Sequence, residues 1–471
     1  MYDMKDGKEN KRGWKTVAGA IVCAAVGFLL CWGWMLYRYP MLKEPAFHNF
    51  AASYQTIMDK YLEGADAKKL IDGASEGMVA SLGDPYSSYM AGELGEAYKD
   101  SYEGEFYGIG AEVRQEDGQF VINALTKDAP AERSGLLPGD RITAVDGNSV
   151  EGLTLQDLVG KLRGDKGTKV KVTVERPGEQ EAIDFELTRE AIPVETVSYR
   201  MLEDGIGLVT ISRFAEKTAE EFDAAIAALK KEGEMKGLLL DLRSNPGGLL
   251  EPTLEIADML VPKDKTVVQV AYKDEKPVIT YKSRQKEAWN IPIAVLVNGQ
   301  SASASEVLTA ALKESAGAVV IGEKTFGKGI VQAFSQFKDG SVLSLTQAQW
   351  KSPNGEWIHK QGIKPDIEIK LPDYAYLKAI SSSSKLKLGS YGDDVKTLQT
   401  MLKTLGYGPV GDIGYFGEQT ASALRAFQQA EGLEATGEYD GKTAYRMIEL
   451  LSAKLEQEDT QLQRGIEELK K

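Results

Sequence analysis

The sequence predicts a multidomain α+β protein with a transmembrane helix, a short helical segment, a β-rich domain, an α/β core and a small three-helix domain. Three observations lead to this fold class. The 471 residues exceed what one hydrophobic core usually organises. An uncharged apolar run lies near the N-terminus. Beyond it, the spacing of apolar residues changes from helical to alternating, then to strands separated by helices, and back to helical.

Composition restricts the classes of function. Apolar residues make up 42% of the chain, and the formal net charge is −14. Nucleic acid is therefore not an expected partner, since phosphate binding needs a basic face. Both cysteines, Cys23 and Cys31, lie in the apolar run, which leaves the rest of the chain without disulfides or a thiol nucleophile. The two histidines do not form the His-Glu-x-x-His spacing of a zinc site, so we expect no metal and no other cofactor.

The apolar run predicts a single membrane-spanning helix. Residues 16–37 carry no charge, and about 20 apolar residues cross a bilayer. Basic residues precede the run, so the positive-inside rule keeps the N-terminus in the cytoplasm and exports the remainder, as in a bacterial cell-envelope protein. A cleaved signal peptide is the alternative, but its apolar region is usually about 7–15 residues, and we favour an uncleaved anchor. The preceding basic residues are Lys5, Lys8, Lys11, Arg12 and Lys15.

Changes in pattern divide the exported part. Aromatic and aliphatic residues recur at helical spacing from residue 44 to about residue 90, and a run of four serines at 381–384 predicts a flexible linker. The predicted parts are 1–40 (cytoplasmic tail and anchor), 41–92 (helical segment), 93–182 (β-rich domain), 183–373 (α/β core), 374–385 (linker), 386–451 (three-helix domain) and 452–471 (an amphipathic tail to which we assign no function).

The β-rich domain resembles a PDZ domain. The resemblance is carried by Ser-Gly-Leu-Leu-Pro-Gly-Asp at 134–140 and by Val-Asp-Gly at 145–147. PDZ domains bind peptide C-termini by adding the peptide as an edge strand. A β-domain that only packs against its neighbours is the alternative. The resemblance places the carboxylate-binding loop, with its backbone N–H groups facing the anion, at Tyr107, Gly108, Ile109 and Gly110.

The α/β core predicts a ligand site where its strands end. Buried strands at 237–242 and 291–297 alternate with helices such as the amphipathic stretch 218–231. In α/β sheets of this kind, ligands bind at the carboxyl ends of the strands. The turn Asn-Pro-Gly-Gly at 245–248 and the cluster Ser-Ala-Ser-Ala-Ser at 301–305 both follow strands.

The serine cluster requires a base, because a serine hydroxyl is a poor nucleophile until its proton is removed. His48 lies in the N-terminal helices. His359, in a strand-like part of the core, is the less favoured candidate. Lys328 stands between two glycines that let its side chain be aimed inward, and it can act as a base if burial lowers its pKa from about 10.4. An exposed lysine in a glycine turn is the alternative. Gln332, four residues on, offers a neutral amide that can orient the lysine without holding its proton.

The motifs together resemble the carboxy-terminal processing peptidases, also called tail-specific proteases. They run in order from 82–87, through 241–248, 301–306 and 325–332, to 362–366. The resemblance implies a serine endopeptidase with Ser303 as nucleophile, Lys328 as general base and Gln332 as the residue that orients the base. It also implies an oxyanion hole formed by the N–H of Ala304 and of a glycine in the 245–248 turn, for which we favour Gly247 over Gly248.

The C-terminal part resembles three-helix peptidoglycan-binding domains over residues 386–451. Gly-Tyr-Phe-Gly at 414–417, followed by Thr420, carries this resemblance, and a shorter echo follows at 437–444. Peptidoglycan is thus an expected partner. A helical module that only adds stability is the alternative.

Taken together, the sequence predicts a membrane-anchored, extracytoplasmic serine endopeptidase that recognises protein substrates through their C-termini. In the family, the PDZ domain either delivers the tail or blocks the site until a tail binds, and both modes stay open here. We expect the C-terminal domain to tether the enzyme to the cell wall, and the N-terminal and tail helices could support a homodimer. The rival functions are a non-catalytic scaffold and an enzyme that acts on the wall itself.

Overall fold

The computed structural model of the chain describes residues 9–92, 94–95, 98, 104–116, 118–273, 277–378, 380–381 and 384–471, without the side chains of 9–16 and 105. Ser382 and Ser383 of the predicted linker lie outside these residues. The chain divides into two compact units, Met1–Ser88 and Tyr89–Lys471, which we describe separately. The basic residues that precede the predicted membrane-spanning segment lie outside the described part (Lys5, Lys8) or are described by their backbone alone (Lys11, Arg12, Lys15).

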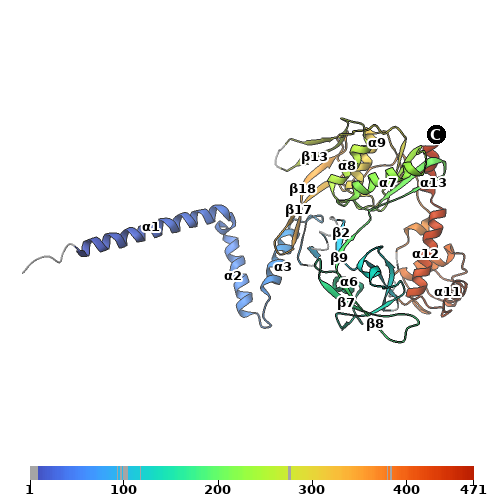
Figure 1. Cartoon of the computed structure of the whole chain (residues 1–471), viewed down its shortest axis with the longest axis horizontal. Helices are drawn as coiled ribbons and strands as arrows, with labels where there is room; N and C mark the ends of the chain where they lie inside the picture. Colours follow the sequence, from blue (N-terminus) through green and yellow to red (C-terminus); the bar gives the residue numbers. More distant parts are fainter. Residues whose placement is uncertain are drawn as a thin grey trace, which may run out of the picture. The chain divides into compact units, whose positions relative to one another are not determined.

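The first unit is helical and coloured blue in Figure 1. Its first helix contains Val17–Arg38, 22 residues with a mean hydropathy of 2.0, which by length and composition could serve as a membrane anchor or as a signal sequence. Asp66 caps the third helix by accepting a hydrogen bond from the Lys69 N–H over 2.9 Å. The elements are α1 (Glu9–Arg38), η1 (Pro40–Lys43), α2 (Pro45–Lys60) and α3 (Ala67–Ala80), and the short strand β1 (Ser88–Met90) follows at the division between the units.

The β-rich domain is an antiparallel sheet in the order β3-β4-β5-β7-β8, with β6 paired to β5. Val170, Val172 and Val174 of β7 face its core, as their alternation predicts. β3 is an edge strand of this sheet, and α6 packs beside it. A separate pair, β2 and β9, flanks the domain in sequence. The elements are β2 (Glu105–Gly108), β3 (Ala111–Glu116), β4 (Gln119–Leu125), α5 (Pro130–Arg133), β5 (Arg141–Val145), β6 (Asn148–Ser149), α6 (Leu155–Leu162), β7 (Lys169–Glu175), β8 (Ile183–Thr188) and β9 (Glu190–Pro193).

The α/β core is built on a six-stranded sheet in the order β10-β11-β12-β15-β16-β19, parallel except for β10. Helices α7, α8 and α9 gather on one side (Figure 1), where Leu238 and Leu240 join the largest hydrophobic cluster. Leu239, between them in β12, belongs to a cluster on the opposite face. The elements are β10 (Val197–Met201), η2 (Glu203–Gly205), β11 (Ile206–Ile211), α7 (Thr218–Glu232), β12 (Gly237–Asp241), α8 (Leu250–Leu260), β15 (Ile293–Val297), α9 (Ala304–Ser315), β16 (Val319–Gly322) and β19 (Ile367–Glu368).

A second, antiparallel sheet accompanies the main one and was not expected from the alternating pattern. β18 pairs with β17 from Val342 to Gln349 and with β13 from Ala348 to Lys351, and β14 pairs with β13. Trp350 of β18 and Val268 of β13 are buried in the same cluster as α7 to α9. The two sheets therefore share one core. The strands are β13 (Thr266–Tyr272), β14 (Ile279–Lys282), β17 (Ile330–Gln336) and β18 (Val342–Lys351).

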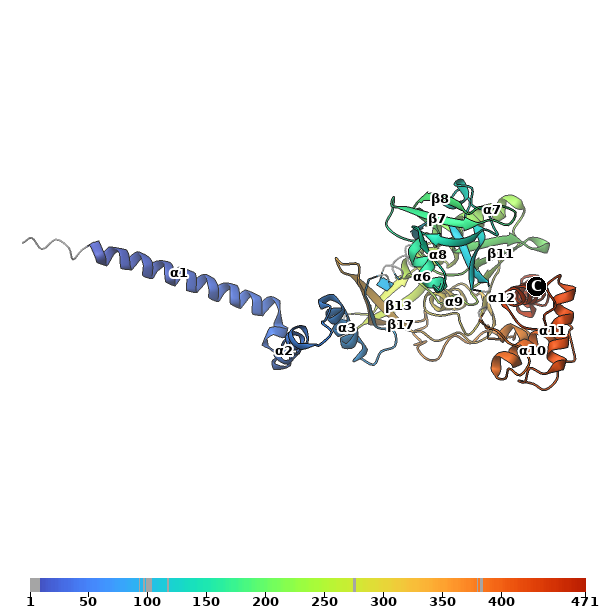
Figure 2. The same cartoon turned by 90° about the horizontal axis from the view of Figure 1, so that it is seen from below.

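The C-terminal domain contains α10 and α11, which pack together and lie side by side in Figure 2, and α12. Two buried glutamines explain the echo in its sequence. Gln399 accepts a hydrogen bond from the Gly414 N–H, and Gln428 accepts one from the Gly437 N–H, each over 2.8 Å. Both glycines have positive φ, 84° and 72°, which glycine adopts at little cost. The helices are η3 (Asp373–Tyr376), α10 (Asp393–Thr404), α11 (Glu418–Ala430) and α12 (Gly441–Gln457).

The amphipathic tail forms α13 (Thr460–Leu469), which packs against β12, β15 and β16 of the main sheet. Its apolar side contributes Leu462, Ile466 and Leu469 to the cluster around Leu239. The tail to which the sequence assigned no function is therefore part of the α/β core.

Candidate active site

Ser303 lies at the turn between β15 and α9, as the N-cap residue of the helix. Its backbone has φ 55° and ψ −116°, a region that costs energy for any residue with a side chain. Its N–H donates to a carboxylate oxygen of Glu306 over 2.9 Å. A strained serine on a sharp strand-to-helix turn is typical of nucleophiles whose hydroxyl must project into a site.

The two outer serines of the cluster are occupied elsewhere. Ser301 donates its hydroxyl to the Leu242 carbonyl over 2.8 Å, and Ser305 donates to the Asn245 carbonyl over 2.9 Å. Both side chains are fully buried. They fasten the serine turn to the loop that follows β12.

A pocket of about 650 Å³ brings the sequence-predicted residues together. Much of the remaining lining is apolar or aromatic and includes Leu249, Val270 and Trp350. Sequence reasoning did not identify these residues, because most of them lie on the unexpected second sheet or in the loop beside it. The predicted residues that line the pocket are Ser303, Ala304, Gly247, Gly248, Lys328 and Gln332.

Neither histidine is among the residues that line this pocket. His359, expected in a strand, instead lies in a turn after the isolated bridge at Trp357, on which its ring stacks with centroids 5.4 Å apart. A Cβ on Gly329 would lie 2.4 Å from the backbone nitrogen of His359. The histidine backbone therefore packs against the lysine loop, which explains the second glycine of that loop.

Lys328 lies in the loop between β16 and β17, and backbone contacts hold this loop. The Trp350 indole N–H donates to the Lys328 carbonyl over 2.9 Å, and the Lys360 N–H donates to the Gly327 carbonyl over 2.7 Å. Gly327 has φ 91°, and a Cβ there would lie 2.8 Å from the Gly362 nitrogen. The Lys328 side chain is half-buried and lines the pocket.

Glu306 joins the serine turn to the lysine loop. Its carboxylate accepts hydrogen bonds from the N–H groups of Ser303 (2.9 Å), Gly327 (2.7 Å) and Lys328 (2.8 Å), and from the Thr325 hydroxyl (2.5 Å). The residue is fully buried. Burial raises the pKa of Glu306 above its usual value, and these hydrogen bonds offset part of that rise. All four partners are donors, so they match an ionised carboxylate, which only accepts.

Sequence reasoning missed Glu306 as a site residue. Its position three residues after Ser303 is that of the acidic residue in a capping box. This pattern predicts the hydrogen bond from the Ser303 N–H to Glu306 and no other contact of Glu306. The contacts with Thr325, Gly327 and Lys328 join residues about 20 positions apart. No periodicity marks them.

The structure separates the two glycines considered for the oxyanion hole. The Gly247 N–H donates to the side-chain oxygen of Asn245 over 2.8 Å. Among the described residues, the Gly248 N–H finds no acceptor. Ala304 is the first residue of α9, where an N–H has no partner within the helix. The sequence favoured Gly247; the hydrogen bond to Asn245 favours Gly248.

Gln332 lies on β17, four residues beyond Lys328, and lines the same pocket. Its amide N–H donates to the Thr346 hydroxyl on the neighbouring β18 over 3.2 Å. The strand register shifts between Val331 and Gln332, and such irregularities redirect side chains. The amide is thus anchored by the second sheet.

The expected carboxylate-binding loop joins β2 to β3. Tyr107 and Gly108 end β2, and the Ile109 carbonyl accepts a hydrogen bond from Ala131 over 2.8 Å. Gly110 has φ 73°, and a Cβ there would lie 2.2 Å from the Cβ of Ala129. Only glycine fits at this position, and the loop leads directly into the edge strand β3.

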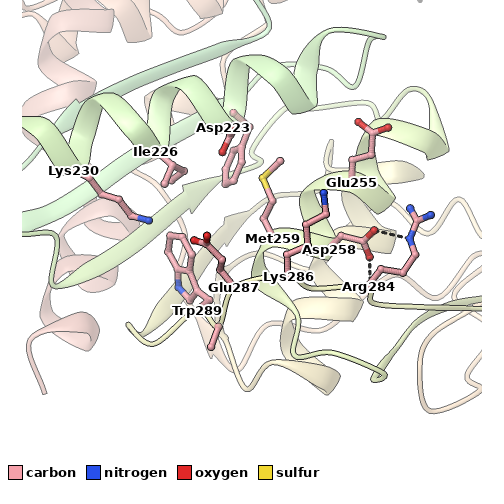
Figure 3. A pocket seen from close by; sticks show the side chains of 12 residues that line it. Asp223, Ile226, Lys230, Glu255, Asp258, Met259, Arg284, Lys286, Glu287 and Trp289 are labelled. Carbon is pink, nitrogen blue, oxygen red and sulfur yellow. Dashed lines mark hydrogen bonds and ion pairs between the residues drawn. The ribbon is translucent and has the colours of Figure 1, made fainter.

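A second pocket, of about 720 Å³, lies between α7, α8 and the segment before β15 (Figure 3). Arg284 donates to Asp258 over 2.9 Å, and the Lys230 ammonium lies 5.5 Å from the centre of the Trp289 ring. Charged residues of both signs line it, and neither a serine nor a histidine is among its lining residues. This pocket therefore offers no hydroxyl or thiol nucleophile. Within the described part of the chain, no group of three or more His, Cys, Asp or Glu residues is placed to hold a metal.

Comparison with known proteins finds matching families for four segments of the chain. Peptidase family S41 matches residues 205–369, a PDZ domain family matches 121–176, and a putative peptidoglycan-binding domain family matches 391–447. The N-terminal domain family of the activating protease CtpB matches residues 40–94.

Whole-chain relatives extend these matches. The carboxy-terminal processing protease CtpA of Bacillus subtilis is 41% identical over 428 residues, covering 91% of each chain. CtpB of the same organism is 38% identical and covers 91% of this chain and 90% of its own. Among solved structures, the photosystem II D1 C-terminal processing protease is 31% identical, covers 65% of this chain and 84% of its own, and has a TM-score of 0.39. On the full-length identity, this chain belongs to peptidase family S41 as a carboxy-terminal processing serine protease.

Proposed function

We propose that the protein is an extracytoplasmic endopeptidase, anchored by its N-terminal helix, in which Ser303 and Lys328 form the catalytic dyad. One observation carries the dyad. A single buried carboxylate, Glu306, holds the backbone of both residues at one pocket. Such a shared support keeps a nucleophile and its base in register.

In the proposed mechanism, the neutral amine of Lys328 removes the proton from the Ser303 hydroxyl, and the oxygen attacks the substrate carbonyl. The oxyanion is received by the N–H of Ala304 and of Gly248 or Gly247. Lys328 then gives the proton to the leaving amine, and a water deacylates the enzyme with the lysine again acting as base. Gln332 helps to orient the lysine from β17.

Digestion of an unstructured protein tests the dyad. Ser303→Ala and Lys328→Ala should each lower kcat by at least about 10³. Lys324→Ala is the matched control, because Lys324 lies in the same loop but is exposed, and its activity should stay close to wild type. Undiminished cleavage by either dyad variant would refute the assignment. The cleavage rate should increase with pH as the Lys328 amine loses its proton.

We also propose that substrates are recognised through their C-termini at the PDZ domain. β3 is an edge strand that follows the loop Tyr107–Gly110 and runs beside α6, which is the geometry needed to add a peptide as a strand. A peptide with a free carboxylate should compete with substrate, whereas the same peptide with an amidated end should not. Equal competition would contradict recognition of the terminus.

Delivery and gating by the PDZ domain predict different responses. If the domain gates the site, a tail peptide that is not cut should raise the cleavage rate of a substrate lacking its own tail. If the domain delivers substrate, the same peptide should not raise the cleavage rate of this substrate and should compete only with substrates that carry a tail. A flat response would contradict gating.

Tethering to the cell wall is proposed from the C-terminal domain. The inactive Ser303→Ala chain should sediment with purified insoluble peptidoglycan and be released by soluble fragments of the same polymer. If the protein is absent from the pellet, the proposed tether to the cell wall is wrong. A homodimer remains a separate prediction, which mass measurement by light scattering would test.

A further inference from the structure

The last helix of the chain lies on the protease sheet. The family matches end at residue 447 and do not include this helix. α13 packs on β12, β15 and β16. A Cβ on Gly465 would lie 2.7 Å from the Leu239 side chain. The helix backbone thus approaches the Leu239 side chain closely, and a larger residue at position 465 would force that side chain to move.

The start of α13 is also linked to the protease core by Arg243, the second residue after β12. The Arg243 guanidinium donates to both carboxylate oxygens of Asp241, over 2.9 and 2.6 Å. Its remaining nitrogen, Nη1, lies 2.8 Å from a carboxylate oxygen of Asp459 and donates to the Gln461 side chain over 3.2 Å. The side chain of Arg243 is 15% exposed, so solvent screens these contacts weakly.

The same residues fix the helix itself. Asp459 accepts a hydrogen bond from the Leu462 N–H over 2.9 Å and so caps α13. Gln461 is fully buried and donates to the carbonyl of Ile369, the residue just after β19, over 2.7 Å. The beginning of α13 is therefore a fixed point to which Arg243 is attached.

Arg243 stands immediately before the turn that carries both oxyanion candidates. In that turn, the Ser244 N–H donates to Asn298 over 2.9 Å. The Asn245 carbonyl accepts from the Ala302 N–H over 3.0 Å and from the Ser305 hydroxyl. Ser244 has φ 58°, which strains the backbone next to Arg243. A shift of Arg243 would be transmitted through one strained residue to the turn and to the serine cluster.

We propose that Arg243, held by Asp459 and Gln461 of the C-terminal tail, is a positioning residue for the oxyanion turn, so that α13 is a working part of the catalytic domain. The proposal rests on the proposed function. If α13 only covered an apolar face, its loss would loosen the three strands beneath it alike, and the oxyanion turn would show no effect of its own.

Asp459→Asn tests the proposal in the full-length protein. The asparagine oxygen can still cap the helix, but the charge that the C-terminal tail places beside Arg243 is gone, while that of Asp241 remains. Loss of an oxyanion donor costs about 10²–10³ in kcat, and a displaced donor should cost about tenfold with KM unchanged within about twofold. Lys470→Ala is the matched control, because Lys470 makes an exposed ion pair with Asp204 at the other end of the same helix. Asp459→Glu, which restores the charge, should recover part of the rate.

Hydrogen–deuterium exchange of the same variants supplies a readout that does not depend on activity. Exchange at residues 244–249 should rise in Asp459→Asn and not in Lys470→Ala, while β15 and β16 stay protected. An equal rise across β12, β15 and β16, or an unchanged kcat, would overturn the proposal. If Asp459→Asn fails to fold, Asp459→Ser, which also caps helices, is measured in its place under the same criteria. Failure of the dyad itself would appear separately, as cleavage by Ser303→Ala.

Discussion

The serine turn and the lysine loop meet at one pocket but are held in different ways. The serine turn is built into the main sheet. Its flanking serines are buried and bonded to the loop after β12, and its backbone is strained at Ser303. The lysine loop lies between the two sheets and is held through its backbone by Glu306 and two indoles.

This difference indicates where the alignment of the proposed dyad is vulnerable. The position of Ser303 is set by many buried contacts within one sheet. The position of Lys328 depends on a few contacts that cross between elements, and one of these is Glu306, which accepts hydrogen bonds from the backbone N–H groups of both Ser303 and Lys328. Substitutions of Glu306, which joins the serine turn to the lysine loop, and of residues within each of the two should therefore differ in effect.

Glu306→Gln should have the largest effect. A glutamine turns an N–H toward at least one of four donors, which leaves buried groups unsatisfied and should cost roughly 2–4 kcal/mol of unfolding free energy. Displacement of the lysine loop by even ~1 Å should lower kcat by about 10². Glu314→Gln, near the other end of α9, is the control and should change both quantities little. Denaturant unfolding and steady-state kinetics measure them. Activity within twofold of wild type would contradict the role given to Glu306.

Stability and activity should depend on pH in opposite ways at the Glu306 carboxyl. Because burial raises its pKa, the folded state binds a proton more tightly than the unfolded state. Its contribution to stability is therefore full below the ordinary glutamate pKa and is lost as pH rises through the raised value.

Activity should move the opposite way, since only the ionised form accepts all four hydrogen bonds. The acid limb of kcat should thus lie above the range of an ordinary glutamate. The stability difference between wild type and Glu306→Gln, measured by thermal unfolding, should shrink as pH rises through the same window. An acid limb at the ordinary glutamate pKa would contradict this reasoning.

The strain at Ser303 predicts an order of stability. Ser303→Gly and Ser303→Ala both remove the nucleophile, but glycine tolerates φ 55° and ψ −116° at much lower cost. The glycine variant should be more stable than the alanine variant by about 1–2 kcal/mol. Denaturant titration of the two inactive proteins measures this difference. If the alanine variant is the more stable, the strain does not reside at this residue.

The smallest effect is expected at the indoles of the lysine loop. Trp350→Phe removes the hydrogen bond to the Lys328 carbonyl and should cost about 1 kcal/mol. Trp357→Phe removes the bond to the Gly329 carbonyl, but this side chain is 43% exposed, so water replaces the indole and the cost should be smaller. Thermal unfolding compares the pair. A larger loss of stability in Trp357→Phe than in Trp350→Phe would contradict this prediction.

The main sheet and the helical parts were predictable because their apolar residues recur at a clear period. The strands around Leu239 and Val295 are continuous apolar runs, and the motifs between them follow strand ends. The second sheet was not predicted. In β17, Gln332, Ser335 and Gln336 interrupt the apolar pattern, and its pairing with β18 follows no strand-helix alternation.

The candidate site was predictable as a set of motifs but not as an arrangement. Lys328 and Gln332 were proposed from the residues around them, and Ser303 was chosen among three serines by resemblance; all three line one pocket. The choice between Gly247 and Gly248 depends on where the side chain of Asn245 points, which no local pattern records. The roles of Glu306 and α13 depend on contacts between residues far apart in the sequence.

The return of α13 to the sheet changes the topology of the C-terminal domain. Because the chain leaves the protease core after β19 and rejoins it at α13, residues 391–447 are an insertion within that core rather than an appendage at its end. A pull on this domain would load the protease at two attachment points, β19 and α13, which contact each other through Gln461 and Ile369. A nick between β19 and α10 would therefore leave the two fragments associated. If residues 391–447 are replaced by another domain, α13 must be kept, because the inserted domain rejoins the protease core there.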